Sequence, residues 1–366
     1  MLLETRNLMK NLLIFGENYD ALKMLLQDAN VYKKIKLVYI DPPYGTNQNF
    51  TFSKDRFSTI SRINGGKIAY EDSLTGAEYL QFLSGRLRLI HTLMADDATI
   101  YIHVDDKMGH YVKVLMDQIF GQKYFINDIT RIKCNPKNFQ RHGYGNIKDM
   151  ILFYSKGREY IWNDARKPVD ENIIIKRYKH IDKSGRRYTT TPLHAPGETI
   201  NGETGKKWKG MDPPPGRHWR YSPEILDELD KNGLIEWSST GNPRKKIFLQ
   251  DVINSGTKVQ DIWSFKDPQN PKYPTEKNIE MLKTILNASS NKGDLILDAF
   301  CGSGTTLVAA QNLERKWIGI DSSSQAINIC ASRLEDFNLI EVGKDRVTNE
   351  YMVEEDIRSG SIRKIV

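Results

Sequence analysis

Short apolar stretches alternate with amphipathic stretches over the first 155 residues of the chain and again from about residue 273. Residues 11–15, 36–40 and 98–104 are apolar runs of strand length. Residues 75–94 carry apolar side chains at helical spacing behind a Thr-x-x-Glu capping pattern. Strands that alternate with helices predict a mostly parallel sheet with crossover helices. The alternation therefore predicts an α/β fold.

A segment of different character, residues 156–262, interrupts the alternation. It is rich in glycine, proline, lysine, arginine and aromatic residues, and its one clear helical signal runs from Ser222 and Pro223 to Gly233. The chain is long enough to bury a large core around an inserted region. We predict a first half, an insert, a second half and a charged tail, at residues 1–155, 156–262, 263–339 and 340–366.

The composition limits the class of protein. Lysine and arginine outnumber aspartate and glutamate, 53 against 46, which permits a polyanionic partner without requiring one. Cys134, Cys301 and Cys330 are far apart and odd in number, so we predict a reducing compartment without disulfides. The histidines lack metal-ligand spacing, and no metal site is predicted. Without a signal peptide or a membrane-spanning stretch, the chain is expected in the cytoplasm, with no membrane partner.

One strand ends on an unusual tetrapeptide. The apolar run 36–40 continues into Asp41, Pro42, Pro43 and Tyr44. Two prolines remove two backbone donors and restrict two φ angles, so this turn is rigid. It is either a structural stop or a carboxylate and an aromatic ring held in a defined geometry. A second Asp-Pro-Pro, residues 212–214, follows lysines and glycine and lacks the aromatic residue, so we interpret it as an irregular loop.

A second motif lies between an apolar strand and a helix that begins near Thr305. Gly302 and Gly304 permit a close backbone approach, and the helix start favours an anionic group. No lysine follows as in a P-loop, and Leu307 replaces the third glycine of a dinucleotide fingerprint. A tight strand–helix turn is an equal alternative for the loop alone. Asp321 ends the next predicted strand, where a carboxylate can accept both hydroxyls of a ribose, which favours an adenosine-containing cofactor.

The two motifs together resemble the amino-group DNA methyltransferases that use S-adenosylmethionine. The catalytic tetrapeptide of that family, Asp/Asn/Ser-Pro-Pro-Tyr/Phe/Trp, matches residues 41–44, and its Phe-x-Gly-x-Gly loop matches residues 300–304. The catalytic motif comes first, as in the β-class enzymes, and the resemblance is to adenine-N6 enzymes related to type II and type III modification methyltransferases. It covers residues 11–337. It implies a Rossmann-like methyltransferase sheet of about seven mostly parallel strands, helices on both faces, and a target-recognition region at residues 156–262.

The resemblance also implies roles for single residues. Besides residues 41–44 as the catalytic motif, it assigns cofactor binding to Asp298, Phe300, Gly302, Gly304, Thr305, Asp321, Thr275 and Lys277. Thr275 and Lys277 would meet the methionine end of the cofactor, although a helix cap explains Thr275 equally well. Glu17 would approach the target base or the cofactor adenine, and a solvated turn acid is the alternative. Two departures, Ala299 for proline and Glu276 for glutamine, do not affect this assignment.

The tetrapeptide suits methylation of an exocyclic amine, whose lone pair is delocalised into the ring. Asp41 and the carbonyl of Pro42 can accept the two amine hydrogens, and Tyr44 can stack on an extruded base. Cys134 precedes Asn-Pro and does not match the nucleophile of cytosine C5 chemistry. In the family resembled, aspartate at the first position goes mainly with adenine N6. Cytosine N4, an RNA or protein amide substrate, a catalytically silent nucleic-acid-binding partner and a nicotinamide oxidoreductase are the alternatives.

Basic residues crowd the insert beside Trp208, Trp219 and Tyr221. A solvated basic face is one interpretation, and contact with double-stranded DNA is the one we favour. The predicted DNA-binding residues are Lys206, Lys207, Lys209, Arg217, Arg220, Arg244, Lys245 and Lys246. The family resembled also admits a homodimer and a cognate restriction endonuclease as partners.

Overall fold

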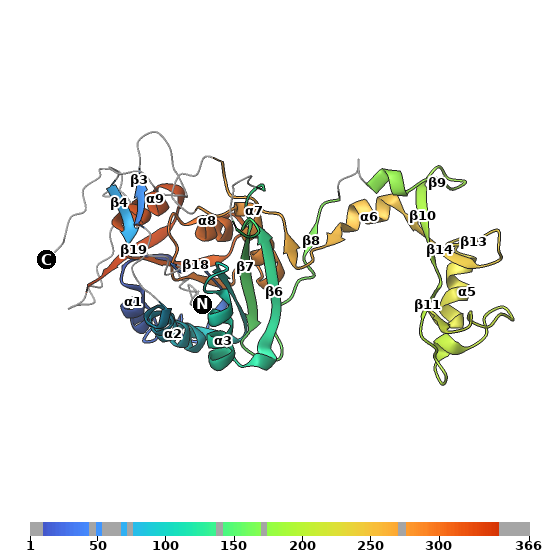
Figure 1. Cartoon of the computed structure of the whole chain (residues 1–366), viewed down its shortest axis with the longest axis horizontal. Coiled ribbons are helices and arrows are strands. Elements are labelled where there is room, and N and C mark those ends of the chain that lie inside the picture. Colours follow the sequence, from blue (N-terminus) through green and yellow to red (C-terminus); the bar gives the residue numbers. More distant parts are fainter. Residues whose placement is uncertain are drawn as a thin grey trace, which may run out of the picture. The chain divides into compact units, whose positions relative to one another are not determined.

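The computed structural model of the protein describes residues 10–43, 49–52, 67–71, 76–136, 142–169, 174–269 and 276–343. The chain divides into two compact units, which are described separately (Figure 1). The α/β unit combines Met1–Ala165 with Gln260–Val366, and the insert unit is Arg166–Val259. The insert unit lies within the predicted insert, residues 156–262, which extends beyond it at both ends.

A nine-stranded sheet forms the centre of the α/β unit, in the order β16-β6-β7-β5-β2-β17-β18-β1-β19. Its strands pair in parallel, except that β7 runs antiparallel to both β5 and β6. The mostly parallel α/β fold is thereby confirmed. The strands are β1 Asn11–Gly16, β2 Ile35–Ile40, β5 Met94–Val104, β6 Phe125–Ile132, β7 Lys148–Ser155, β16 Ile262–Trp263, β17 Leu295–Asp298, β18 Lys316–Asp321 and β19 Phe337–Val342.

Two of these strands add to the number expected from the sequence. β16 has two residues, which is too short for any periodic signal, and β19, Phe337–Val342, extends into the predicted tail, which begins at residue 340. Both lie at the ends of the sheet, so the central order does not depend on them. A separate two-stranded hairpin is formed by β3 Asn49–Phe52 and β4 Lys67–Glu71.

Helices cover both faces of the sheet, as predicted (Figure 1). Among the described residues, one group of helices lies on one face and a second group on the other, and the two groups come from different parts of the sequence. The first group is α1 Asn18–Leu25, α2 Gly76–Leu93 and α3 Gly109–Phe120, and the second is α7 Ile279–Ser289, α8 Thr305–Asn312 and α9 Ser324–Arg333. None of the helices within the described ranges is both long enough and apolar enough to cross a membrane.

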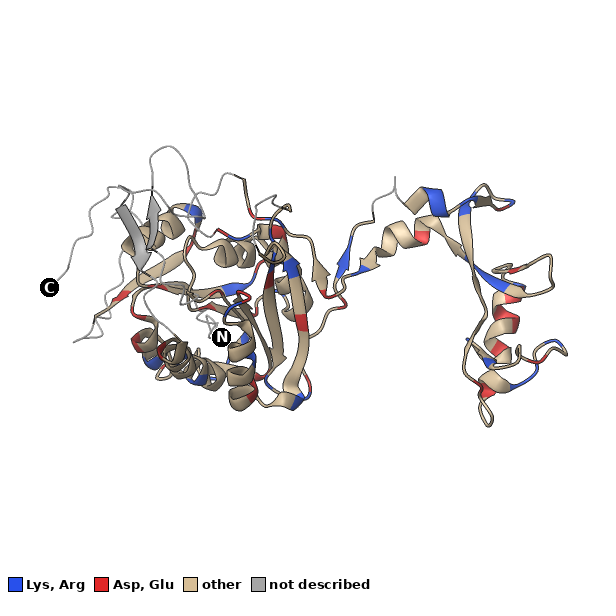
Figure 2. Cartoon of the chain, in the orientation of Figure 1, with Lys and Arg blue, Asp and Glu red and all other residues tan. Residues whose placement is uncertain are grey.

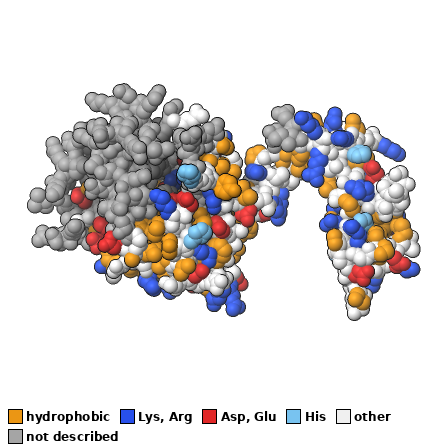
Figure 3. Space-filling view, in the orientation of Figure 1, with side chains coloured by type: hydrophobic (Ala, Val, Ile, Leu, Met, Phe, Trp, Pro, Cys, Tyr) orange, Lys and Arg blue, Asp and Glu red, His pale blue; other side chains and the backbone are white. Residues whose placement is uncertain are grey.

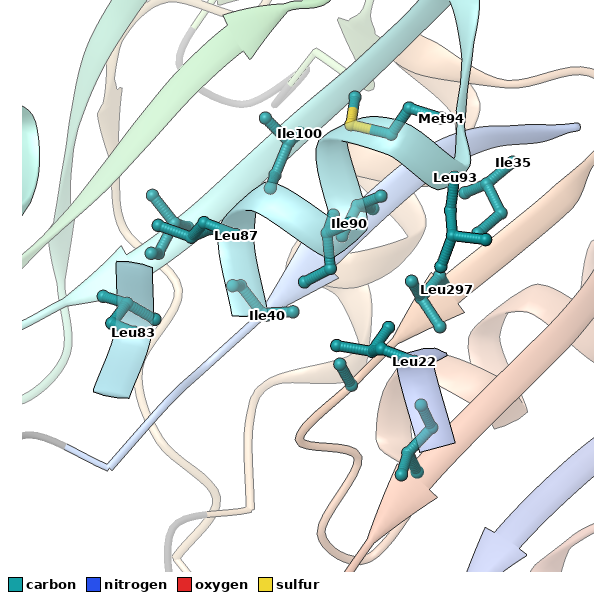
Figure 4. Packing of buried hydrophobic residues seen from close by; sticks show 14 of the residues in the cluster. Leu22, Ile35, Ile40, Leu83, Leu87, Ile90, Leu93, Met94, Ile100 and Leu297 are labelled. Atoms are coloured by element: carbon teal, nitrogen blue, oxygen red, sulfur yellow. The ribbon is translucent and has the colours of Figure 1, made fainter. Parts of the chain in front are cut away.

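The helix α2 illustrates how the apolar spacing positions these layers. Leu83, Leu87 and Ile90 are fully buried in the cluster that also contains Ile40 of β2 and Ile100 of β5 (Figure 4). Burial of each such side chain contributes about 1.5–3 kcal/mol. The helix ends at Leu93, and β5 begins at Met94, four residues before the predicted strand. The apolar face thus fixes α2 against the strand that carries the Asp-Pro-Pro turn.

Strand register brings the predicted motifs to one edge of the sheet. Val38 of β2 is level with Leu297 of β17, so Asp41 and Phe300, each three residues further on, leave the sheet together. Asp298 is level with Gly319, and Phe15 with Asp321. In an open α/β sheet the carboxyl edge is where ligands bind. The order β2-β17-β18-β1 therefore gathers the Asp-Pro-Pro turn, the glycine loop, Asp321 and Glu17 at this edge.

The insert unit is built on a four-stranded antiparallel sheet in the order β13-β14-β10-β9. The predicted helix forms as α5, Pro223–Lys231, and Gly233 follows it with φ 68°. The sheet itself was not predicted, because its strands are only two to six residues long. The other elements are β8 Arg166–Lys167, β9 His180–Ile181, β10 Arg187–Pro192, β11 His194–Pro196, β12 Arg217–Trp219, β13 Ile235–Trp237, β14 Pro243–Phe248, β15 Thr257–Lys258, α6 Leu249–Ser255 and short 3₁₀ turns η2 Ile175–Arg177 and η3 Glu203–Gly205.

Two tryptophans next to the predicted DNA-binding residues form the core of the insert unit. Trp208 and Trp219 are 1% and 2% exposed and pack with Leu193, Leu226 and Ile235. The Trp208 Nε1–H donates to Asp227 at 2.8 Å, and the Trp219 Nε1–H donates to the carbonyl of Lys206 at 3.1 Å. The two rings beside the predicted DNA-binding residues are therefore buried and do not form part of an exposed surface. A small unit needs large side chains to form a core, and here tryptophan supplies them.

Candidate active site

The Asp-Pro-Pro turn places one carboxylate at the end of β2. Asp41 is partly buried, Pro42 is buried, and Tyr44 lies outside the described residues. The Asp41 Oδ2 lies 2.6 Å from the Nζ of Lys277, and these side chains are 16% and 11% exposed. An ammonium group thus already donates to the carboxylate in this structure. The family resemblance assigned both Lys277 and Thr275 to cofactor binding. Thr275 lies outside the described residues.

In the glycine loop, the backbone at Gly304 adopts a conformation that only glycine takes without strain. Gly304 has φ 78°, and a Cβ built on it would lie 2.2 Å from the Sγ of Cys330. Its carbonyl begins the helix α8, whose first residue is Thr305. The Gly302 N–H donates to the Oδ2 of Asp321 at 2.8 Å. The loop therefore contacts β18 through Asp321 and α9 through Cys330.

Two further carboxylates stand near Asp41. Burial raises the pKa of Asp298 to about 7, although hydrogen bonds from Thr306 and from the Phe300 N–H lower it, and the charges of Asp41 and Asp321 raise it further. Burial also raises the pKa of Asp321, against hydrogen bonds from the N–H groups of Ser323 and Gly302. The charges of Asp41 and Asp321 thus act on Asp298, and a cation bound beside these carboxyl groups would offset that repulsion.

An arginine that the sequence analysis did not identify supports the loop. The Nη1 of Arg333, at the end of α9, donates to the carbonyl of Ser303 at 2.9 Å and lies 3.1 Å from Glu276. The Arg333 and Glu276 side chains are 17% and 11% exposed. Glu276, one of the departures from the family pattern, therefore contacts the residue that braces the loop. A cation in the last turn of a helix is common, so the sequence carried no signal of this role.

Glu17 is fixed by the fold. It accepts the Tyr19 N–H at 2.7 Å as the N-cap of α1 and forms an ion pair with Arg86 of α2. Arg86 also donates to Asn18, whose Nδ2 donates to the carbonyl of Ala299 at 2.9 Å. The link joins α1 and α2 to the residue before Phe300. An approach of Glu17 to a base or a cofactor stays a prediction.

A buried polar network lies beside the Asp41–Lys277 pair. The Nδ1 of His103 is 2.9 Å from the Tyr39 hydroxyl, and its Nε2 is 3.1 Å from Asp149. Burial lowers the pKa of His103, so the ring is neutral at pH 7. Burial raises the pKa of Asp149, but the hydrogen bond from His103 and the charge of Lys133 outweigh it and hold the pKa below its usual range. Nε2–H therefore donates to Asp149, and Nδ1 accepts from Tyr39.

The Asp149 carboxylate is the common acceptor of this network. Lys133 donates to its Oδ1 at 2.7 Å, and Arg131, fully buried, lies 3.3 Å from its Oδ2. In the sequence, only Asp149 stands out, directly before the apolar run 150–154, whereas Arg131 lies among other polar residues of its strand. Buried charges require partners, and these two residues supply one another.

The predicted DNA-binding residues of the insert unit have partners within that unit. Lys206 lies 2.6 Å from Glu203, Lys207 lies 3.4 Å from Asp212, and Lys209 pairs with Asp230. The others contact neutral groups: Arg217 the ring of His194, Arg220 the carbonyl of Pro192, Arg244 Thr190, Lys245 the hydroxyl of Tyr221, and Lys246 the carbonyl of Gly233.

Comparison with known proteins places this arrangement in a family. The model of a DNA methylase family, the N6 and N4 methyltransferases, matches residues 35–332. The chain is 46% identical over 326 residues to the type II methyltransferase M.EcaI of Enterobacter cloacae, which covers 87% of this chain and 68% of that protein. It is 26% identical over 402 residues to the probable type III HindVI Mod subunit of Haemophilus influenzae, covering 89% of this chain and 50% of that subunit.

Among solved structures, the M1.HpyAVI–SAM complex gives a TM-score of 0.45 at 16% identity and covers 88% of this chain and 100% of that one. The family match includes the Asp-Pro-Pro turn, the insert unit and the glycine loop, so it extends over both units of the structure. The chain belongs to the N6/N4 family of DNA methylases.

Proposed function

We propose that the protein transfers a methyl group from S-adenosylmethionine to the N6 amine of adenine in double-stranded DNA. The observation that carries the proposal is the contact of Lys277 with Asp41, 2.6 Å long, at the end of a Pro-Pro turn. A nitrogen donor is already held on the carboxylate that would accept an amine hydrogen. The base amine would take the position of the lysine ammonium.

The residues at the carboxyl edge fit the cofactor. Asp321 would accept the ribose hydroxyls, and the Asp41 carboxylate, which accepts an ammonium group in this structure, favours a cationic sulfonium over a neutral ligand. When bound, S-adenosylmethionine supplies an activated methyl group. Phe300, next to the loop glycines and 6.2 Å from the Phe82 ring, would border the cofactor on the apolar side.

The chain's own residues would then act on the base. Asp41 and the carbonyl of Pro42 accept the two amine hydrogens, which draws the nitrogen toward tetrahedral geometry and stabilises the positive charge that develops on it. The excess proton leaves the amine through these acceptors. Tyr44 would stack on the extruded adenine. Lys277 must move off the acceptor oxygen for this to occur.

The choice of adenine rests on Asp41, because a charged acceptor takes more of the developing charge than the serine usual in cytosine-N4 enzymes. The relatives named above are a type II methyltransferase and a type III modification subunit. A role in restriction–modification, with a cognate endonuclease, follows as part of the proposal.

The test is the chemical product. DNA from a host that expresses the protein and DNA from the same host with an empty vector are digested to nucleosides and compared by mass spectrometry. We expect N6-methyladenine above the level of the empty-vector host, and modification-sensitive sequencing should place it at one recurring site. N4-methylcytosine without N6-methyladenine would overturn the assignment of the base, and no new methylated nucleoside would overturn the activity.

A further inference from the structure

Most of the net charge of the chain resides in the insert unit. Residues 166–259 hold 18 lysines and arginines against 12 aspartates and glutamates, which accounts for six of the seven net positive charges of the protein. The charges are not mixed evenly. Within this unit, Figures 2 and 3 show acidic residues mostly around α5, whereas basic residues lie around β9 and β10 and also beside α5.

The acidic end of the unit neutralises the lysines nearest to it. Lys206 and Lys207 pair with Glu203 and Asp212, and Lys209 pairs with Asp230 at the end of α5. A lysine that already holds a carboxylate has to lose that partner before it can bind a phosphate. The group at 206–209, which the sequence analysis favoured for DNA contact, is therefore close to neutral as a whole.

The other end carries cations without such partners. Lys176, Arg177, Lys179, Lys183 and Arg187, here called the basic cluster, are exposed, and no salt bridge joins them to a carboxylate of the described ranges. The acid among them, Asp182, is engaged within its own turn: it accepts the N–H groups of Ser184 and Arg186 and pairs with the Arg186 guanidinium at 2.8 Å.

The backbone that carries the basic cluster is anchored. Tyr178 and Tyr188 are 4% and 8% exposed, and Tyr188 packs on Phe248. Antiparallel register pairs Arg187 with Ile181 and Tyr188 with His180. Since side chains alternate between the faces of a strand, Arg187 and its partner Ile181 lie on the face opposite the Tyr188 ring. The segment that carries the basic cluster is therefore anchored by two buried tyrosines.

We propose that the basic cluster is the surface through which the insert unit contacts the phosphates of duplex DNA. The proposal rests on the proposed function, and it deepens it by assigning the phosphate contact to the basic cluster rather than to lysines 206–209. Cations free of carboxylate partners bind phosphates and release the counterions condensed on DNA without first breaking an ion pair. Such contacts position a protein on the duplex and do not read its sequence.

The test compares two triple variants that remove equal charge. One carries Lys176→Ala, Lys179→Ala and Lys183→Ala, and the other carries Lys206→Ala, Lys207→Ala and Lys209→Ala. The Kd for duplex DNA is measured from low to moderate salt for both and for the parent protein. Each phosphate contact contributes about 0.9 to the slope of log K against log salt. We expect the first variant to lose about 2–3 from that slope and the second to keep the parent slope within about 0.5.

The outcomes separate this inference from the proposed function. Methyl transfer by the parent protein tests the function, and the difference between the variants tests the surface. Equal loss of slope in both variants would mean that only net charge matters, and an unchanged slope in the first would remove the basic cluster from the interface. Either overturns the inference. An RNA duplex serves as a further probe, and tighter binding of RNA than of DNA, with the same dependence on the basic cluster, would overturn the assignment to DNA.

Discussion

Arg86, Arg131 and Asp149 of the α/β unit are at most 8% exposed, and each has ionic partners. The basic cluster of the insert unit is exposed and lacks carboxylate partners in the described ranges. Buried charges with partners hold neighbouring elements in place, and removal of one partner leaves a costly unpaired charge. Exposed cations contribute little to folding and remain available to a ligand. The comparison thus distinguishes buried, paired charges, which hold structural elements in place, from exposed charges, which are available to bind a ligand.

The same distinction applies to residue types that occur in both units. Each unit has an Asp-Pro-Pro, a glycine at positive φ after or before a helix, and tryptophans. For each of these features, the burial and the neighbouring residues differ between the α/β unit and the insert unit. Matched substitutions therefore test whether context, rather than residue type, decides the role.

The largest effect is expected from Trp208→Ala. Loss of a buried tryptophan costs about 3–5 kcal/mol, whereas Trp237→Ala should cost about 1 kcal/mol, because Trp237 is 42% exposed and stacks on Trp208 at 5.6 Å. Amide hydrogen exchange of β10 and β14 in the full chain reports the local free energy of opening. Protection should fall by about 10²-fold or more for Trp208→Ala. Unchanged protection together with weaker DNA binding would contradict the role of Trp208 as a core residue and would place it in contact with DNA.

Asp41→Ala should reduce the methylation rate constant by about 10²–10³-fold, because a charged acceptor at the reacting nitrogen is lost. Affinities for S-adenosylmethionine and DNA should change far less. The matched variant is Asp212→Ala in the second Asp-Pro-Pro, whose side chain is 68% exposed beside Lys207. Single-turnover methylation and binding are measured for both. A rate near that of the parent in Asp41→Ala, or an equal loss in Asp212→Ala, would contradict the assignment of the site.

Gly304→Ala should cost about 2–3 kcal/mol of unfolding free energy. The new Cβ would combine a φ of 78° with a 2.2 Å approach to the Sγ of Cys330. Gly233→Ala, at φ 68° with nothing within 4 Å of the new Cβ, should cost only about 1 kcal/mol. Urea unfolding of the full chain measures both. The double variant Gly304→Ala with Cys330→Ala should recover part of the loss, and no recovery would mean that the contact with sulfur is not the cause.

Sequence reasoning identified the α/β fold, the order of the motifs and the family because those features are local. Apolar periodicity reports which face of an element is buried, and proline or glycine at a strand end reports a backbone requirement. Residues 156–262 were harder to interpret. Their strands are too short for a period, and a tryptophan beside lysines has the same letters whether it stacks on a base or fills a core.

Asp41 and Lys277 are separated by 236 positions along the chain, and Glu17 and Arg86 by 69. No local pattern pairs them. The pairs exist because β17 lies beside β2, which brings the second half of the chain to the turn after β2, and because α2 packs beside α1. Likewise, whether a lysine of the insert unit is neutralised depends on which carboxylates the fold brings near it. The amino-acid sequence by itself determined which chemical groups the protein carries and which backbone turns hold them. The tertiary structure decided which of those groups meet, because charge pairing acts over a few ångströms of space and not along the chain.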